Sequence, residues 1–185
     1  MSTAKTEARV LKTNMISPVG TFQWVFLDKP KVDKNNPEKD PMYTITLLMD
    51  KKDPKVKEKI ELMKSCIKDA LEKRFADKVP AKYYSPIKDG DVETNSEDNP
   101  IYPGYFYIEA KNKEKPGLVD ADREPILENS AVWSGCKGRL SLGFVGYDVA
   151  AKKGVTIYLN NVQLLDNSAP KMGGRKSAEE DFAEE

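Results

Sequence analysis

The chain has 185 residues, of which 39% are hydrophobic and 32% charged, with 30 basic and 30 acidic side chains. This size and composition predict one soluble domain with a sizeable core, and no apolar run approaches the ~18 residues of a membrane span. The chain has no histidine, which excludes Ser-His-Asp and Cys-His catalysis and removes the commonest zinc ligand, so we expect no metal and no cofactor.

Extended segments come first along the chain. Residues 7–16 and 19–27 are predicted to be strands, the second because it is rich in aromatic and β-branched side chains. Three prolines and many turn-forming residues predict a loop over 29–41. Alternation of apolar and polar side chains then predicts a half-buried strand over 43–49.

One amphipathic helix follows. Asp53 is suited to the N-cap and Pro54 to the first helical position. The helix is predicted to end near Pro80 and to cover one face of a sheet, with Cys66 as a small core residue. Its apolar stripe recurs at three- and four-residue steps and consists of Val56, Ile60, Met63, Ile67, Leu71 and Phe75.

Strand character returns after a loop-rich stretch over 80–104. Strands are predicted over 105–111, 139–148 and 155–165, and the last two are joined by a hairpin loop in which Gly154 takes the left-handed position. The order of strands, one helix and more strands predicts a small closed β-barrel with a single helix, and does not fit alternating βα units.

The outward faces of these late strands carry tyrosines. Period-two alternation predicts an inner aliphatic face on each strand and an outer face that bears tyrosine, accompanied in two strands by a base. Rings interleaved with bases suit unpaired nucleic acid, because bases stack on the rings and cations neutralise phosphates. The alternative is ordinary barrel tyrosines with solvated hydroxyls. The stacking candidates are Tyr105, Tyr107, Tyr147, Tyr158 and Trp24, whose face the sequence leaves undecided between core and groove, and the phosphate candidates are Lys111, Lys113, Lys137 and Arg139.

The last nine residues, 177–185, form an acidic tail. Residues 1–176 carry a net charge of +5 and the tail carries −5, with one aromatic ring, Phe182. A block of like charge after the glycines at 173–174 predicts a disordered arm that competes with nucleic acid for a basic groove; the alternative is a terminus that serves only solubility. The predicted division is a binding domain over 1–168 and a hinge with tail over 169–185. The candidate docking residues of the tail are Glu179, Glu180, Asp181, Phe182, Glu184 and Glu185.

Two other functions compete with nucleic-acid binding. Asp89 and Asp91 upstream of Glu109 and Lys111 resemble the acid-and-lysine cluster of metal-dependent nucleases, in which carboxylates hold Mg²⁺. A protein-interaction or virion domain could also share the barrel without binding nucleic acid.

The order of several short motifs resembles a known family. The pieces are Lys88–Asp91, Gly104–Lys111, Pro116–Asp120, Trp133–Cys136 and Leu159–Gln163, followed by the acidic ending. They are similar to the bacteriophage single-stranded DNA-binding proteins with an oligonucleotide/oligosaccharide-binding (OB) fold, long described as a phage domain of unknown function. The opening of the chain is similar to the replication proteins of T-odd phages.

This resemblance implies a mainly β protein with an OB fold, a small closed Greek-key barrel. It implies a non-enzymatic protein that coats single-stranded DNA during phage replication or recombination in the host cytoplasm. The tail would dock on replication proteins and on the protein's own groove, although three residues follow Phe182 where relatives often end near the aromatic. A homodimer, the site size and the preference between DNA and RNA stay open.

Overall fold

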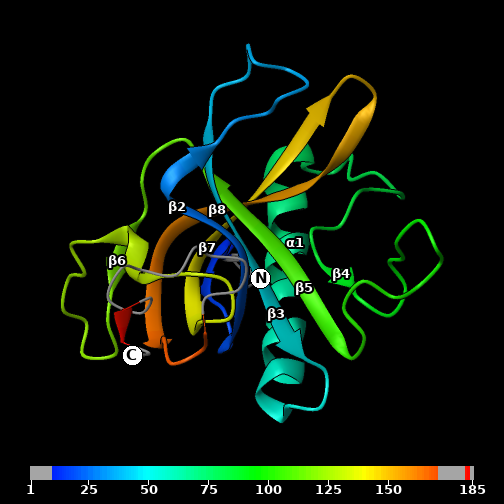
Figure 1. Ribbon diagram of the computed structural model, residues 1–185. Coiled ribbons are helices and arrows are strands. Elements are labelled where there is room, and N and C mark those ends of the chain that lie inside the picture. The colour runs from blue at the N-terminus through cyan, green and yellow to red at the C-terminus, as the bar shows by residue number, and fades with distance from the viewer. Residues whose placement is uncertain (1–9, 171–181, 184–185) are drawn as a thin grey trace, which may run out of the picture.

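A computed structural model describes residues 10–170 and 182–183 of the chain, which form a mainly β structure with one α-helix (Figure 1). The helix α1 spans Pro54–Phe75, and a short 3₁₀ turn spans Asn129–Ala131. The strands are β1 (Asn14–Ile16), β2 (Gly20–Lys31), β3 (Met42–Asp50), β4 (Lys88–Asp89), β5 (Tyr105–Asn112), β6 (Gly117–Val119), β7 (Lys137–Val149) and β8 (Lys152–Asp166).

The strand pairing curls the sheet. Its order is β1-β7-β2-β3-β5-β8-β6, with β4 on the edge of β5, and β7 pairs with both β2 and β8. The pairing therefore leads from β2 through β3, β5, β8 and β7 back to β2. β5 and β8 run parallel and are paired at Lys111 and Tyr158, whereas β7 and β8 pair along their whole length. The expected mainly β, OB-like architecture is confirmed at this level.

The predicted helix and its start are confirmed, but the helix ends at Phe75, before the expected Pro80. The Asp53 side chain accepts a hydrogen bond from the Lys55 N–H at 2.9 Å, as an N-cap should. The apolar stripe is buried as far as Leu71 and Phe75 is half-buried. The helix packs on β7, where Gly146 permits close approach, since a Cβ there would lie 2.7 Å from Cβ of Arg74.

The half-buried strand predicted over 43–49 is wrong in one respect. Residues 44–49 are buried on both faces, with outward Thr46 and Leu48 only 6% and 7% exposed. The outward side chains are covered by longer neighbours on the adjoining strands, since Thr46 lies between Gln23 of β2 and Glu109 of β5. Alternation in polarity therefore did not mean alternation in exposure.

The hairpin between β7 and β8 also differs from the prediction. Ala150 and Ala151 take the left-handed conformation, with φ of 49° and 65°, as a two-residue primed turn requires. Gly154 instead serves close packing. A Cβ there would lie 2.6 Å from the Tyr84 carbonyl oxygen and 2.8 Å from the Tyr147 hydroxyl.

The boundaries of other elements shift as well. β2 runs on to Lys31 into the predicted loop, and the strand expected over 7–16 begins at Asn14 among the described residues. β4 and β6 were not predicted, since strands of two and three residues are too short to show a period.

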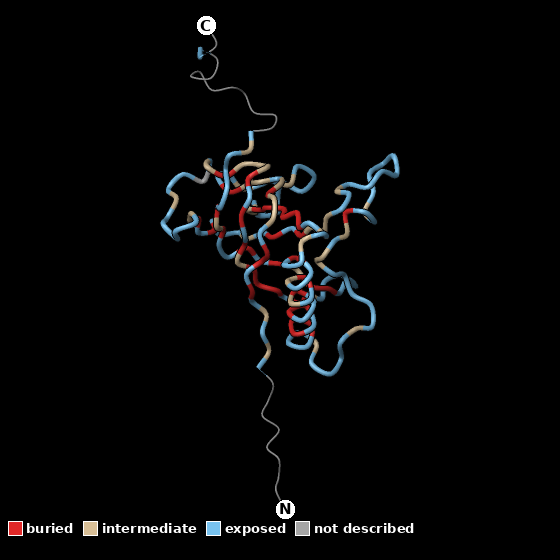
Figure 2. Tube along the Cα trace, turned by 90° about the horizontal axis from the view of Figure 1, so that it is seen from below, coloured by how far each residue is buried: buried red, intermediate tan, exposed pale blue. Residues whose placement is uncertain are grey.

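The core lies between the curled sheet and the inner side of α1, and the connections around it are exposed (Figure 2). The β2–β3 connection and the β7–β8 hairpin project at the same end of the molecule (top of Figure 1). Among the described residues no helix combines the length and hydropathy needed to cross a bilayer.

Candidate nucleic-acid interface

A groove of ≈890 Å³ lies beside the outer face of β5, between the two projecting connections. Four tyrosines line it: Tyr84, Tyr107, Tyr147 and Tyr158. Four lysines line it as well: Lys39, Lys88, Lys111 and Lys152. Glu109 is the one carboxylate among these described lining residues, so the groove is strongly basic although the whole chain is neutral.

Strand register explains why the tyrosines meet. Tyr107 and Lys111 lie on the outer face of β5, alternating with buried Ile108 and Ala110, as predicted. Lys111 is paired with Tyr158 of β8. Tyr147 lies opposite Gly154 near the tip of the β7–β8 hairpin, which extends the groove beyond the sheet.

The phenol of Tyr107 is a neutral ring. Burial is the first cause that raises its pKa, followed by the negative charge of Glu93. Its hydroxyl therefore stays protonated at neutral pH, and the ring offers a flat uncharged surface within the basic groove.

Two of the predicted cations lie elsewhere. Arg139 lines a second groove of ≈520 Å³ together with Arg123, and its Nε donates to Oε1 of Gln163 at 2.5 Å. Lys137 begins β7 opposite Thr21 of β2. Because β7 is long and curled, its start lies beside β2 and its end in the projecting hairpin. Residues on one face of this strand therefore reach different parts of the surface.

Lys113 follows β5 and pairs with Asp40 of the β2–β3 connection at 2.9 Å. This hydrogen bond raises the pKa of Lys113 and lowers the pKa of Asp40. Both side chains are exposed, so the pair links the connection to the end of β5 without removing the cation from solvent.

Tyr105 and Trp24 lie outside the residues that line the main groove. Tyr105 lies at the far end of β5, opposite Asp50. Trp24 does not share the buried face of Phe22, because the β2–β3 register is irregular between Gln23 and Phe26. Its indole N–H donates to the Tyr102 hydroxyl at 3.0 Å, and the residue is 64% exposed. Trp24 therefore belongs neither to the core nor to the residues that line the main groove.

Sequence reasoning missed the groove residues that lie on connections. Tyr84 precedes β4 and is held beside β8, where its N–H donates to the Lys153 carbonyl at 2.9 Å. Lys39 comes from the β2–β3 connection, and Lys152 is the first residue of β8, directly after the turn of the projecting hairpin. The sequence feature that could have indicated Tyr84 is the aromatic pair at 83–84. The pair lies in a loop, however, where no alternation assigns a residue to one face of a sheet.

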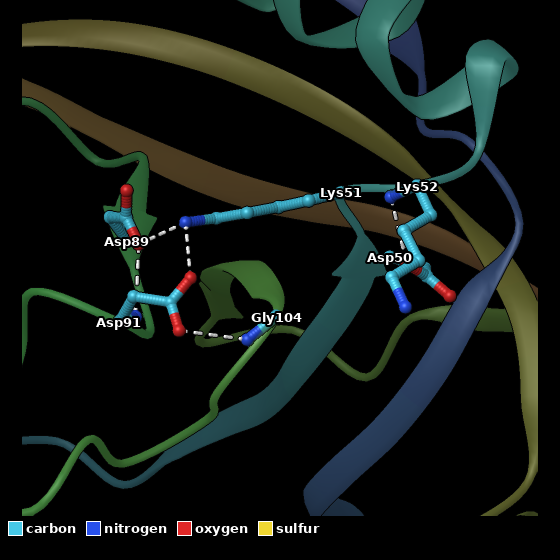
Figure 3. Close-up of polar contacts among 6 residues, drawn as sticks. All are labelled: Asp50, Lys51, Lys52, Asp89, Asp91 and Gly104. Carbon is cyan, nitrogen blue, oxygen red and sulfur yellow. Dashed lines mark hydrogen bonds and ion pairs between the residues drawn. The ribbon is translucent and has the colours of Figure 1, made fainter.

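The cluster proposed for the nuclease alternative does not form. Lys51 Nζ lies 2.5 Å from Oδ1 of Asp89 and 2.6 Å from Oδ2 of Asp91, whose Oδ1 accepts the Gly104 N–H at 3.0 Å (Figure 3). Asp89 pairs with Phe106, three residues before Glu109 and thus about 10 Å along the strand. Within residues 10–170 and 182–183 no cluster of His, Cys, Asp or Glu could hold a metal ion.

Replacing Lys51 by methionine should lower the unfolding temperature by a margin that depends on pH. The hydrogen bond from Lys51 is the main cause that lowers the pKa of Asp89 and of Asp91, and Asp89 in turn raises the pKa of Lys51. Carboxylates with lowered pKa stabilise the fold above their unfolded pKa of about 4, and this is lost as the pH falls through the lower folded value. Lys51 contributes fully below its unfolded pKa of about 10.4, and this is lost as the pH rises through the higher folded value.

The margin should therefore be widest between about pH 5 and 9 and shrink toward both ends. Thermal melts of the two proteins from about pH 3 to pH 11, which extend beyond both ends of this range, measure it. Lys64→Met is the matched control, since the ion pair of Lys64 with Glu61 is exposed on both sides. A margin that does not vary with pH would show that Lys51 acts through packing alone.

Of the predicted tail residues, Phe182 is described and is 81% exposed. Glu179, Glu180, Asp181, Glu184 and Glu185 lie outside the described residues.

Known proteins resemble the chain along most of its length. Protein p50 of Acyrthosiphon pisum secondary endosymbiont phage 1 is 29% identical over 133 residues, which are 66% of this chain and 70% of that protein. Among solved structures, the fold is similar to the single-stranded DNA-binding protein from bacteriophage Enc34 in complex with ssDNA, with a TM-score of 0.70 and 21% identity over 87% of this chain and 90% of that chain. It is also similar to gp2.5, a single-stranded DNA-binding protein encoded by bacteriophage T7, with a TM-score of 0.63 and 18% identity over 91% and 99% of the two chains.

A protein family matches almost the whole chain. Residues 15–185 match the family described as "Enterobacter phage Enc34, ssDNA-binding protein". The resemblance inferred from motif order is confirmed, and the nuclease alternative is wrong. The chain belongs to this family of non-enzymatic phage single-stranded DNA-binding proteins.

Proposed function

We propose that this protein binds single-stranded DNA with little sequence preference and coats it during phage replication or recombination. The observation that carries the proposal is the groove in which four tyrosines and four lysines meet beside an OB-like sheet. OB folds bind oligonucleotides on one face of the barrel, between two loops that project from it. In this proposal the β2–β3 connection and the β7–β8 hairpin take the place of those loops. The Enc34 relative solved in complex with ssDNA supports the same ligand.

The division of labour follows from the chemistry of the side chains. Tyr107, Tyr147 and Tyr158 stack with bases, which every base permits because each has a flat π face. Lys111 and Lys113 neutralise phosphates at the end of β5. Lys137 and Arg139 neutralise phosphates of the DNA strand where it leaves the main groove. Tyr105 is proposed to stack with a base beyond the other end of the groove. In this proposal residues 1–168 act as one closed OB barrel and 169–185 as a hinge and tail.

Binding should weaken steeply with salt. The four groove lysines alone, if each neutralises about one phosphate, predict a slope of about −3 in a plot of log affinity against log salt, and Lys113, Lys137 and Arg139 would steepen it. Fluorescence anisotropy with labelled single-stranded DNA, duplex DNA and RNA of one length measures this slope and the preference together. Absence of any binding at low salt would contradict the proposal and favour a protein-interaction domain.

The acidic tail competes with DNA for the same lysines. Five of the last nine residues are acids, and the remaining chain carries +5. Removing residues 177–185 should therefore tighten binding to single-stranded DNA at low salt, with the gain fading as salt screens the charges. Titration of the full-length and shortened chains with the same oligonucleotide measures the difference.

A full-length chain with the five tail acids replaced by amides is the matched control, and it should bind as the shortened chain does. Equal affinity of all three proteins would remove self-competition from the proposal. The tail is also proposed to dock on phage or host replication proteins, which the shortened chain should no longer retain in a pull-down.

A further inference from the structure

Trp24 is a large aromatic ring held at the surface by a strained backbone. It is 64% exposed, although it lies within β2, and its φ of 48° is in the left-handed region. A bulky residue rarely adopts this conformation, and such strain is often kept where function needs it. The β2–β3 register is irregular at this point, between Gln23 and Phe26. The strained backbone thus coincides with the place where the ring leaves the core side of the strand.

The exposed indole is fixed by a tyrosine from another part of the chain. Its Nε1 donates to the Tyr102 hydroxyl at 3.0 Å. The Tyr102 ring meets Tyr107 edge-on, with centroids 5.1 Å apart. Since β3 lies between β2 and β5, this link from Trp24 to Tyr102 passes over β3, whose outward Thr46 is buried. Trp24 is therefore connected through Tyr102 to the main groove.

The backbone of Tyr102 packs closely against Gly90. The Tyr102 N–H donates to the Gly90 carbonyl at 3.2 Å, and a Cβ on Gly90 would collide with the Tyr102 carbonyl oxygen, so only glycine leaves room for this approach. Two residues further on, Gly104 is tied to Asp91, and Asp91 to Lys51 (Figure 3). The loop that carries Tyr102 is thus anchored on both sides of the ring.

The charges around this loop determine which part of a nucleotide it suits. Asp89 and Asp91 are paired with Lys51, whereas Glu93 and Glu109 lie close enough to Tyr107 for their charge to raise its pKa, in addition to the larger effect of burial. An acidic surrounding disfavours phosphate, but an uncharged indole stacks with any base. The part of a nucleotide that fits against Trp24 is therefore the base, with its phosphate turned to solvent.

We infer that Trp24 is a further base-stacking subsite that extends the groove past Tyr107, and that Tyr102 is its positioning residue. This inference rests on the proposed binding of single-stranded DNA and adds to it a direction and an additional contact. A single DNA strand that lies along the groove from Tyr158 passes over Tyr107 and places a further base on Trp24.

A length series tests the subsite. The full chain and its Trp24→Ala variant are titrated with thymidine oligonucleotides of about 4, 8, 12 and 16 nucleotides, the range of sites known for one OB fold. The variant should match the parent on the shortest oligonucleotide that binds and lose about tenfold in affinity on the longer ones. Tyr83→Ala is the matched control, because Tyr83 is 43% exposed but does not line the groove.

Salt separates stacking from charge in the same titrations. The ratio of the two affinities should stay constant as salt rises, whereas binding itself weakens. Equal affinity at every length, an equal loss at every length, or a ratio that vanishes with salt would each overturn the subsite. Absence of binding by the parent protein would instead contradict the proposed function.

Fluorescence tests the stacking and the role of Tyr102. The chain has two tryptophans, so in a Trp133→Phe variant the emission comes from Trp24 alone. A 16-mer should quench that emission strongly, and a 4-mer should quench it little. Adding Tyr102→Phe keeps the ring but removes the acceptor of the indole N–H, so the anisotropy of the free protein's indole should fall and quenching should need more DNA. Emission that DNA does not change would overturn the assignment of Trp24, and unchanged anisotropy would overturn that of Tyr102.

Discussion

Replacing Tyr107 and Tyr158 together by alanine should weaken binding to a thymidine oligonucleotide by about 30-fold or more. Each base stacked on an aromatic ring contributes about 1–3 kcal/mol, and the variant loses two such rings from one groove. The smaller sum, about 2 kcal/mol, corresponds to the 30-fold limit. Both side chains face outward from strands whose inner faces are buried, so the fold should persist. Anisotropy titrations at constant salt measure the loss, and a thermal melt checks the fold.

The loss should be equal for thymidine, adenosine and mixed-sequence oligonucleotides, because stacking does not depend on base edges. Tyr83→Ala again serves as a control outside the groove, and it should bind as the parent does. A loss confined to one base would point to hydrogen-bonded readout of base edges. Full affinity in the double variant would contradict the groove as the binding site.

Replacing Gly138 by alanine should destabilise the protein by about 3 kcal/mol, a fall in unfolding temperature of roughly 10 °C. A Cβ there would collide with the Gln163 carbonyl oxygen and lie 2.6 Å from Cζ of Phe22. The first contact is with the backbone of β8 and the second with a fully buried ring, so neither can move without disturbing the sheet or the core. Denaturant unfolding of the two proteins measures the difference.

Gly104→Ala provides the comparison. Gly104 has a φ of 83°, but a Cβ added there would have no atom within 4 Å, so alanine costs backbone strain without a clash, about 1 kcal/mol. If the two variants lost equal stability, the close approach at Gly138 would have no special energetic weight.

The helix and the strand faces could be predicted from the sequence because both depend on local periods. Asp53 and Pro54 mark the helix start, and the apolar stripe up to Leu71 is buried as predicted. The inner and outer faces of β5 also follow from alternation at Tyr107 and Ile108. Alternation fails at Trp24, because a register irregularity and a positive φ interrupt the period of β2.

Local patterns in the sequence were enough to predict that outward tyrosines accompany bases, that the tail is acidic, and that the motif order is that of a phage DNA-binding family. Which of the outward faces meet depends on the three-dimensional fold. Tyr107, Tyr147 and Tyr158 share one groove, whereas Arg139, on the same strand as Tyr147, lines another. This is because a strand's period fixes the side on which a residue lies, whereas curvature and pairing between distant segments fix what lies beside it. Tyr84 and Tyr102 lie outside the named strands, so no alternation predicts their orientation. Their positions depend on long-range contacts, with Lys153 for Tyr84 and with Trp24 for Tyr102.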